Sequence, residues 1–403
     1  MWDENELKGV EFIPEPTDSR ILSATDPNTI GHQDGWRSEV IGWDPEPIPV
    51  VSRQRRNSQR IANIGILVLV SIIFWAASQY LIIELPPPTS EWAFEEVGAR
   101  DLQDSGLTGD GVRVCMVDTG IDNTHPDLKN LDLVFKDFVT GSSEPVDHGT
   151  LAHGTMMAGI LAADGYLQGV APGVTLGMAA ALGEDGTGGN SGNEQSVANA
   201  IEWCWRTFEA DIISLSLGGE SDPDAERDGP TTNAVRLALA NGVYVVAAAG
   251  NDGDTDDGRV ATPSNVAEVI SVAALDKEGE VWSGSSRGSS TDNDGQDRTE
   301  PHQKPEISAP GVGIISTANS GEYYSSTGTS DATVFVSGIL ALILEAEPAL
   351  KSSPSLDCIT QVKVALMESA DPLESDIEHD LHWGYGSING EDWLEQIRAS
   401  GIC

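Results

Sequence analysis

The chain has 403 residues, 39% hydrophobic and 21% charged, and 22 Lys and Arg against 64 Asp and Glu leave a net charge of −42. This apolar content suffices for a large core and excludes a wholly disordered chain. The acidic composition excludes nucleic acid as a partner, because phosphate binding needs a basic face. Such an acidic composition is typical of salt-adapted (halophilic) proteins, because concentrated salt screens the repulsion between their surface carboxylates. An ordinary acidic secreted enzyme is the alternative.

The N-terminal part predicts a tail and a membrane anchor. Residues 1–60 are rich in Pro and acidic residues, and we expect an acidic, largely disordered tail. Residues 61–83 carry no charge and would span roughly 34 Å as a helix, enough for the hydrocarbon core of a bilayer; a buried core helix is the alternative. The positive-inside rule makes the tail cytoplasmic and the rest extracellular, because four arginines precede the apolar run: Arg53, Arg55, Arg56 and Arg60. We therefore expect a single-pass cell-membrane protein that contacts the lipid bilayer through residues 61–83.

The remaining residues predict a linker and one α/β domain. Residues 84–104 are expected to form the linker, and residues 105–397 the domain. Buried strands are predicted at 112–117, 174–180, 211–217, 243–249 and 269–273, and helices at 153–163, 196–205, 232–240 and 330–344. Such alternation of apolar strands and helices predicts a mostly parallel sheet with helices on both faces.

Four polar residues are placed where ligands bind in such sheets. Asp118 and Asn251 end or follow apolar strands, and His153 and Ser330 begin apolar helices. Because ligands bind at the carboxyl ends of parallel strands, these four side chains can meet at one edge of the sheet.

The chain has four cysteines, and all of them follow the apolar segment: Cys115, Cys204, Cys358 and Cys403. An oxidising location would permit disulfides, with three connectivities open. Cys115 lies in an apolar strand and is expected to be a small buried hydrophobic residue. A bridge between Cys358 and Cys403 is one of the pairings that we consider.

Several motifs resemble those of the subtilisin-like serine proteases. VRVCMVDTGIDNTHPDL (112–128) resembles the aspartate motif of that family, HGTMMAG (153–159) its histidine helix, and GTS (328–330) with VSG (336–338) its serine motif. Counterparts follow in family order for GVAP (169–172), ALGEDGTG (181–188), IEWC (201–204), SLSLGG (214–219) and AAAGND (247–252). The resemblance covers about residues 105–395. It implies a three-layer subtilisin-like fold and an endopeptidase that acts on proteins or peptides.

The resemblance also implies a role for each of the four polar residues. Ser330 would be the nucleophile, and His153 the base that takes its proton and returns it to the leaving amine. Asp118 would orient the imidazole and stabilise the imidazolium. The Ser330 backbone N–H and the Asn251 amide would bind the oxyanion of the tetrahedral intermediate. A catalytically inactive peptide-binding or scaffold protein on the same fold is the alternative.

Two segments match the strand edges that flank the substrate in the family. They are Ser216-Leu217-Gly218 and Gly186-Thr187-Gly188. An extended peptide binds such edges through main-chain hydrogen bonds, and glycine permits close approach. The alternative is that these residues form only a strand end and a turn.

Two further histidines and two further acids are weaker candidates than these four residues. HGT occurs twice, but only His153, and not His148, is followed by the small Ala-Gly pair that lets a helix pack closely. His125 is expected in a loop, with Asp122 and Asp127 as turn and loop residues. His148 and His153 lack zinc-site spacing, and no metal ligand is predicted.

Two residues near the serine depart from the family pattern. Asp331 stands where the family usually has Met, and Val334 where it usually has Pro. An acid is favoured at a helix N-terminus, which is one explanation for Asp331. The other is that its charge raises the pKa of His153 or repels acidic substrates.

No cofactor is expected. The loop between Ala163 and Gly169 is shorter than the one that builds the strong calcium site of the family, although Asp127 matches one ligand position. The acidic runs 252–258 and 291–297 have oxygen ligands for a hard cation, with solvated acidic loops as the alternative.

Overall fold

The computed structural model describes residues 53–80, 89–219, 229–352, 355–374 and 377–403. The chain divides into two units, residues 1–85 and 86–403. The predicted tail up to residue 52, and residues 81–83 of the predicted membrane segment, lie outside the described residues.

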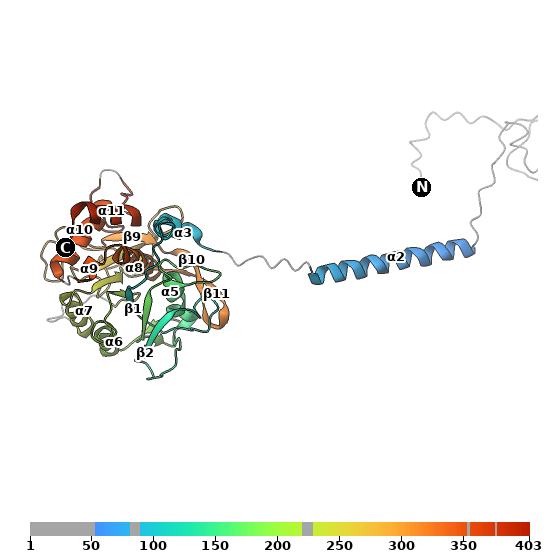
Figure 1. Ribbon diagram of the computed structural model, residues 1–403, viewed down its shortest axis with the longest axis horizontal. Helices are drawn as coiled ribbons and strands as arrows, with labels where there is room; N and C mark the ends of the chain where they lie inside the picture. Colours follow the sequence, from blue (N-terminus) through green and yellow to red (C-terminus); the bar gives the residue numbers. More distant parts are fainter. Residues whose placement is uncertain (1–52, 81–88, 220–228, 353–354, 375–376) are drawn as a thin grey trace, which may run out of the picture. The chain divides into compact units, whose positions relative to one another are not determined.

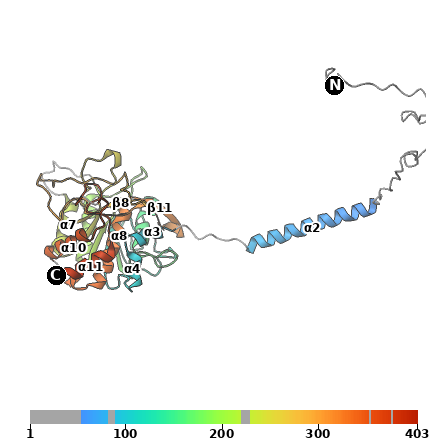
Figure 2. The same cartoon turned by 90° about the horizontal axis from the view of Figure 1, so that it is seen from above.

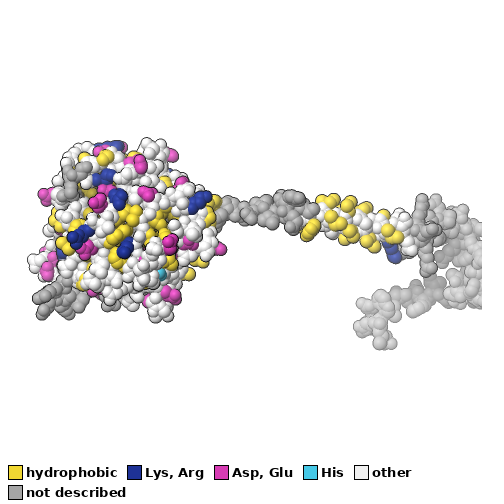
Figure 3. Space-filling view, turned by 60° about the horizontal axis from the view of Figure 1, so that its bottom comes forward, with side chains coloured by type: hydrophobic (Ala, Val, Ile, Leu, Met, Phe, Trp, Pro, Cys, Tyr) yellow, Lys and Arg dark blue, Asp and Glu magenta, His cyan; other side chains and the backbone are white. Residues whose placement is uncertain are grey.

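The described part of the first unit is a single helix, α2 (Arg53–Tyr80). It begins eight residues before the predicted apolar segment, because the Arg and Gln residues there have good helix propensity. The stretch Asn57–Trp75 has a mean hydropathy of 1.6 and is 0% buried. Figure 3 shows its hydrophobic side chains along the surface of the helix. The helix is therefore apolar, exposed and long enough to cross a membrane.

The second unit is built on a seven-stranded sheet in which every pairing is parallel. The strand order is β2-β3-β1-β6-β7-β8-β9. In chain order the strands are β1 (Arg113–Asp118), β2 (Asp132–Asp137), β3 (Thr175–Ala180), β6 (Ile212–Leu215), β7 (Tyr244–Ala248), β8 (Ile270–Leu275) and β9 (Ile307–Pro310). The predicted α/β class and parallel sheet are confirmed.

Helices cover both faces of this sheet (Figures 1 and 2). The main helices are α5 (His153–Ala162), α6 (Glu194–Arg206), α7 (Pro230–Ala240) and α8 (Thr329–Ala346). Along the chain, α5 lies between β2 and β3, and α6 lies between β3 and β6. Helix α7 packs beside α6, and α8 packs against α5.

The direction of the chain connections reverses between β1 and its neighbour β6. From β1 the chain continues to β2 at one side of the sheet, and from β6 it continues to β7 at the other. In parallel sheets, the crevice at such a reversal lies at the carboxyl ends of the strands and is where ligands bind. Asp118, the last residue of β1, therefore stands at the expected position of a site.

Helix α8 is the buried centre of the unit. Sixteen of its residues, Thr329 to Leu344, are buried. It is apolar and long enough to resemble a membrane span, but most of it is buried inside the unit. It packs against β6, β7, β8 and β9, so it is the core helix that fixes the position of Ser330.

Residues 89–104 differ from the predicted linker. They form α3 (Glu91–Glu96) and α4 (Ala99–Asp104), whose apolar side chains belong to the core. The hydroxyl of Ser90 accepts the Ile315 N–H at 2.7 Å, and the Val97 carbonyl accepts the Gly390 N–H at 3.0 Å. These long-range contacts hold the segment in place. Two helices of six residues are too short to show a helical hydrophobic period in the sequence, so the sequence did not predict them.

The remaining elements surround the sheet. Two small antiparallel pairs are formed by β4 (Gly183–Glu184) with β5 (Asn190–Ser191), and by β10 (Val312–Thr317) with β11 (Tyr323–Thr327). Three helices follow α8: α9 (Ala349–Ser352), α10 (Leu356–Ser369) and α11 (Gly390–Ser400).

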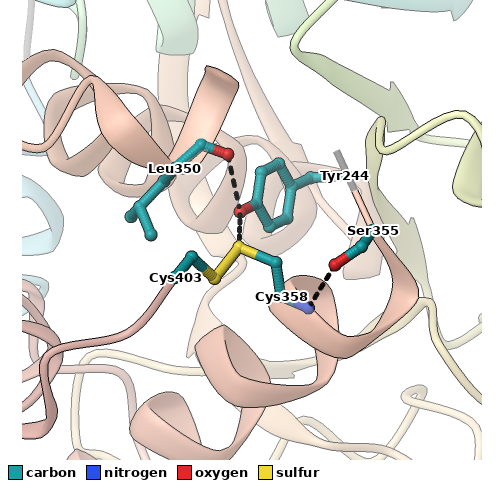
Figure 4. The surroundings of a disulfide bond; sticks show 5 residues. All are labelled: Tyr244, Leu350, Ser355, Cys358 and Cys403. Atoms are coloured by element: carbon teal, nitrogen blue, oxygen red, sulfur yellow. Dashed lines mark hydrogen bonds between the residues drawn. A yellow bond between two sulfur atoms is a disulfide. The ribbon is translucent and has the colours of Figure 1, made fainter. Parts of the chain in front are cut away.

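All four cysteines are paired. Cys115 on β1 is bonded to Cys204 on α6, so the expectation that Cys115 is only a buried hydrophobic residue misses its bond. Cys358 on α10 is bonded to Cys403, and this bridge ties the end of the chain to the unit beyond the predicted boundary at 397. Figure 4 shows its surroundings, where the Tyr244 hydroxyl lies against the Cys358 sulfur.

Candidate active site

Asp118 and His153 form the centre of the candidate site. Asp118 is 1% exposed at the end of β1, and its Oδ1 accepts the Thr119 N–H at 2.6 Å. His153 is the first residue of α5, and its Nδ1 lies 2.7 Å from the same Oδ1. The buried carboxylate fixes Nδ1 as the protonated nitrogen, because a carboxylate only accepts. The other ring nitrogen, Nε2, is then free to act as a base.

The charge around His153 favours its protonated form. Burial opposes this by lowering the pKa of the imidazole, but the charge and hydrogen bond of Asp118 raise it more strongly. The charges of Asp331 and Asp147 add to the increase, and the pKa of His153 is raised to about 9. The surrounding carboxylates are therefore arranged to stabilise an imidazolium.

Asp147 joins the segments that carry Asp118 and His153. Its Oδ1 accepts the Thr119 hydroxyl at 2.7 Å, and its Oδ2 accepts the N–H and the hydroxyl of Thr155 at 2.9 and 2.6 Å. The Thr119 hydroxyl in turn accepts the Gly154 N–H at 2.8 Å. A Cβ on Gly154 would lie 2.2 Å from the Gly120 carbonyl oxygen, so only glycine permits this close approach of α5 to β1.

Ser330 lies near the start of α8 and faces the same cleft as His153. Its hydroxyl donates to the Ser216 carbonyl at 3.3 Å, and the Ser216 hydroxyl donates to the Ser330 carbonyl at 3.1 Å. The structure therefore brings the two predicted residues to one cleft, with the hydroxyl hydrogen-bonded to a carbonyl rather than to the imidazole. Such bonds are often long before substrate binds and tighten in the complex.

Asn251 is held beside the serine by Thr329. It follows β7, and its Oδ1 accepts the N–H and the hydroxyl of Thr329 at 3.0 and 2.9 Å. With Oδ1 engaged, the Nδ2 amide is the end that remains to donate. A Cβ on Gly328 would lie 3.3 Å from this Nδ2, so the amide faces the turn that carries Ser330.

The cleft has a volume of about 1390 Å³ and contains three of the four candidates in its lining: His153, Asn251 and Ser330. The fourth, Asp118, lies behind His153. The predicted edge Ser216, Leu217 and Gly218 also lines the cleft. A peptide laid along this edge would pass the Ser330 hydroxyl.

The second predicted edge is not at the cleft. Gly186, Thr187 and Gly188 lie in the exposed turn between β4 and β5, where both glycines have positive φ. Asp185 Oδ1 accepts the N–H and hydroxyl of Thr187, both at 2.7 Å, and this bonding holds the turn. The residues that line the cleft here come next in the chain: Asn190, Ser191 and Gly192. Sequence reasoning missed them because the pairing of β4 and β5 decides which residues face the cleft.

The rejected histidines have structural partners. His148 Nε2 lies 3.2 Å from Asp137 Oδ2, and His125 is fully buried with its Nε2 3.1 Å from the Glu322 carbonyl. Asp122 caps a nearby turn by accepting the Ser320 N–H at 2.8 Å. The choice of His153 over His148 and His125 stays a prediction.

Both carboxylate oxygens of Asp127 accept hydrogen bonds from the protein. Its Oδ1 accepts the Tyr166 N–H at 2.8 Å, and its Oδ2 accepts the Leu167 N–H at 3.0 Å and the Tyr323 hydroxyl at 2.9 Å. The short loop after Ala163 therefore brings its own N–H groups to this carboxylate. Over the described parts of the chain, no group of three or more His, Cys, Asp or Glu side chains is arranged to hold a metal ion.

The two departures near the serine are both buried. Val334 is 0% exposed within an unbroken α8, so the helix forms without the proline that is usual at this position. Asp331 is 1% exposed, and its carboxylate accepts the Ser326 hydroxyl. Burial is the main influence on this acid and raises its pKa to about 7.

The fold and this cleft are those of a subtilisin-like serine protease, and comparison with known proteins gives the same class. The Subtilase family pattern matches residues 109–386, and the chain belongs to this family. It is 33% identical over 326 residues to Serine protease AprX of Bacillus subtilis (strain 168), covering 74% of this chain and 70% of that protein. It is 35% identical over 300 residues to Subtilisin DY of Bacillus licheniformis, covering 73% and 95%. The chain is a serine endopeptidase that acts on protein or peptide substrates.

Proposed function

We propose that this endopeptidase cleaves peptide bonds through a triad of Ser330, His153 and Asp118. The observation that carries the proposal is the 2.7 Å contact between His153 and a buried Asp118, with Ser330 in the same cleft. An alkyl hydroxyl is a poor nucleophile until a base takes its proton. A neutral His153, oriented by Asp118, supplies that base.

In the first half of the reaction, Ser330 Oγ attacks the scissile carbonyl carbon and its proton passes to His153 Nε2. The oxyanion that forms accepts hydrogen bonds from Asn251 Nδ2 and the Ser330 N–H at the start of α8. The imidazolium then donates its proton to the leaving amine, and an acyl-enzyme remains. Water attacks this ester in the second half, and the proton transfers run in reverse.

Replacing the nucleophile tests the triad. We expect Ser330→Ala to abolish hydrolysis of a generic protein substrate and labelling by a fluorophosphonate, with an unchanged circular dichroism spectrum. The matched control is Ser337→Ala on the same helix, whose hydroxyl donates to Ser214 at 2.9 Å away from the cleft. Labelling that survives Ser330→Ala would exclude the triad. A wild-type protein that folds but turns over no substrate would favour the inactive scaffold.

We further propose that α2 anchors the enzyme in the cell membrane, with the peptidase unit outside. Three features support this: the exposed apolar stretch Asn57–Trp75, the arginines that precede it, and two disulfides, which persist in oxidising compartments. The tether would confine proteolysis to proteins at or near the cell surface.

Fractionation and protease protection test the anchor. The full chain should remain with membranes after alkaline carbonate washing, and protease added to intact cells should digest the peptidase unit. Placing charges within α2, as in Val68→Arg with Ile72→Arg, should release the protein from membranes. Recovery of the unaltered chain in the soluble fraction would refute anchoring.

We propose, finally, that the enzyme is adapted to high salt. The net charge of −42 supports this, because screening at molar salt removes much of the self-repulsion that destabilises a compact acidic chain. Both the unfolding midpoint and the turnover of a neutral peptide should rise between 0.1 and 2 M KCl. A protein equally stable and active across this range would be an ordinary acidic enzyme.

A further inference from the structure

Asp331 is a buried acid placed directly behind the proposed nucleophile. It follows Ser330 in the first turn of α8, and its side chain is 1% exposed. Its carboxylate accepts a hydrogen bond from the hydroxyl of Ser326 on β11. This bond joins the end of β11 to the first turn of α8 across the turn at Gly328. Ser330 lies in that first turn and faces the cleft.

The carboxylate is also electrostatically coupled to the proposed base. Asp331 is among the groups whose charge raises the pKa of His153, and His153 in turn lowers the pKa of Asp331. Three carboxylates thus act on the imidazole from three parts of the fold: Asp118 from β1, Asp147 from the segment before α5, and Asp331 from α8. Asp118 bonds to the ring directly and Asp147 bonds to its neighbours, but Asp331 acts only through its charge.

We propose that Asp331 is a positioning residue that sets how readily His153 accepts the Ser330 proton: its buried carboxylate, held by Ser326, stabilises the imidazolium from the side of α8. The inference rests on the proposed triad. It assigns a role to the buried acid that directly follows the proposed nucleophile in the chain.

The ionised carboxylate has two effects with a definite sign. In the free enzyme it keeps His153 protonated up to a higher pH, so the acid limb of the activity profile lies further to the alkaline side. In the transition state it stabilises the imidazolium that forms when His153 takes the proton, so the plateau rate is higher. Burial raises the pKa of Asp331 to about 7, and the pKa of His153 is raised to about 9, so the carboxylate is already ionised at the pH at which the base loses its proton.

The test compares pH profiles of kcat and kcat/KM for wild type and Asp331→Asn, which keeps the shape of the side chain without its charge. We expect the acid limb to move down by about 1 pH unit, as for loss of one nearby opposite charge. The plateau kcat should fall roughly tenfold, the equivalent of one pKa unit of imidazolium stabilisation, with KM unchanged. A residue that served only to hold the turn would lower the rate without moving the limb.

Two further variants separate charge from fold. Ser326→Ala removes the hydrogen bond that favours the ionised carboxylate, so the acid limb should move down by a smaller amount than in Asp331→Asn. Asp331→Met also removes the charge, so the acid limb of its pH profile should lie at the same pH as that of Asp331→Asn. The control is Asp137→Asn, another buried carboxylate, which accepts the Val139 and Ser142 N–H groups away from the cleft. It should keep the wild-type profile.

Each outcome is decisive. A limb that does not move in the variants that fold, as judged by fluorophosphonate labelling and circular dichroism, overturns the role of Asp331. Failure of the triad itself would be seen separately, as wild-type protein that is not labelled or Ser330→Ala protein that still cleaves. If Asp331→Asn does not fold, Asp331→Met and Ser326→Ala carry the same test.

Discussion

The hydroxyl of Thr119 donates to Asp147 Oδ1 at 2.7 Å and accepts the Gly154 N–H at 2.8 Å. Thr119 follows Asp118, and Gly154 follows His153, so this one side chain couples the end of β1 to the start of α5. Residues adjacent in sequence to two members of the proposed triad are thus bonded to each other across the fold. The distance between Asp118 and His153 is set by this contact as well as by their own hydrogen bond.

Removing the Thr119 hydroxyl should therefore reduce both stability and rate. Thr119→Val leaves the Gly154 N–H without its buried acceptor and Asp147 without one donor, which should lower the free energy of unfolding by about 2 kcal/mol. A looser pairing of Asp118 and His153 should reduce kcat roughly tenfold to a hundredfold. Urea unfolding and steady-state kinetics measure the two effects.

A second threonine–aspartate pair supplies the control for Thr119. The Thr175 hydroxyl donates to Asp132 Oδ2 at 2.7 Å, on an exposed part of β2 and β3. Thr175→Val should change stability by less than about 1 kcal/mol and leave kcat unaltered. Equal effects of the two variants on kcat would show that Thr119 has no special relation to the triad.

The amide of Asn251 should contribute to the rate and not to substrate binding. Asn251→Ala should lower kcat roughly 100- to 1000-fold with little change in KM, the loss expected for one oxyanion donor. Asn251→Asp keeps an oxygen to accept the Thr329 N–H but has no amide N–H, so it should be at least as slow. Activity of Asn251→Asp close to wild type would remove Asn251 from the oxyanion site.

The raised pKa of His153 predicts how activity depends on pH. Because its pKa is raised to about 9, the imidazole is mostly protonated at neutral pH, and kcat/KM should rise as pH approaches 9. The measurement is kcat/KM between pH 5 and 10 at constant ionic strength. An acid limb that is already complete at pH 7 would contradict this environment for His153.

The same shift predicts a pH dependence of stability. The pKa is higher in the folded than in the unfolded protein, so folding is stabilised by bound protons. This contribution is fully present below the unfolded pKa of about 6.5 and is lost as pH rises through about 9. The free energy of unfolding should therefore fall more between pH 6.5 and 9 in wild type than in His153→Ala. If the free energy of unfolding depended on pH in the same way in wild type and in His153→Ala, the raised pKa of His153 would be contradicted.

The residues that could be predicted from the sequence are those whose position follows from one element alone. Asp118 ends an apolar strand and His153 begins an apolar helix, and the two side chains meet where the chain connections reverse between β1 and β6. The turn at Gly186 was misplaced because cleft contact there depends on how β4 pairs with β5. The helices α3 and α4 were missed because contacts with distant residues, and not local periodicity, hold them on the core.

The environment of Asp127 predicts that chelators will not destabilise the enzyme at this site. Its two oxygens already accept two N–H groups and the Tyr323 hydroxyl, so a cation would have to displace bonds that the fold has formed. The unfolding temperature should be the same with and without EGTA. Tyr323→Phe, which removes only the hydroxyl, should lower the free energy of unfolding by about 1 kcal/mol or more, because a carboxylate loses a donor. The opposite outcome has two parts: EGTA lowers the unfolding temperature of the wild type, and it has no such effect on Tyr323→Phe. That result would mean that Asp127 binds a cation with help from Tyr323.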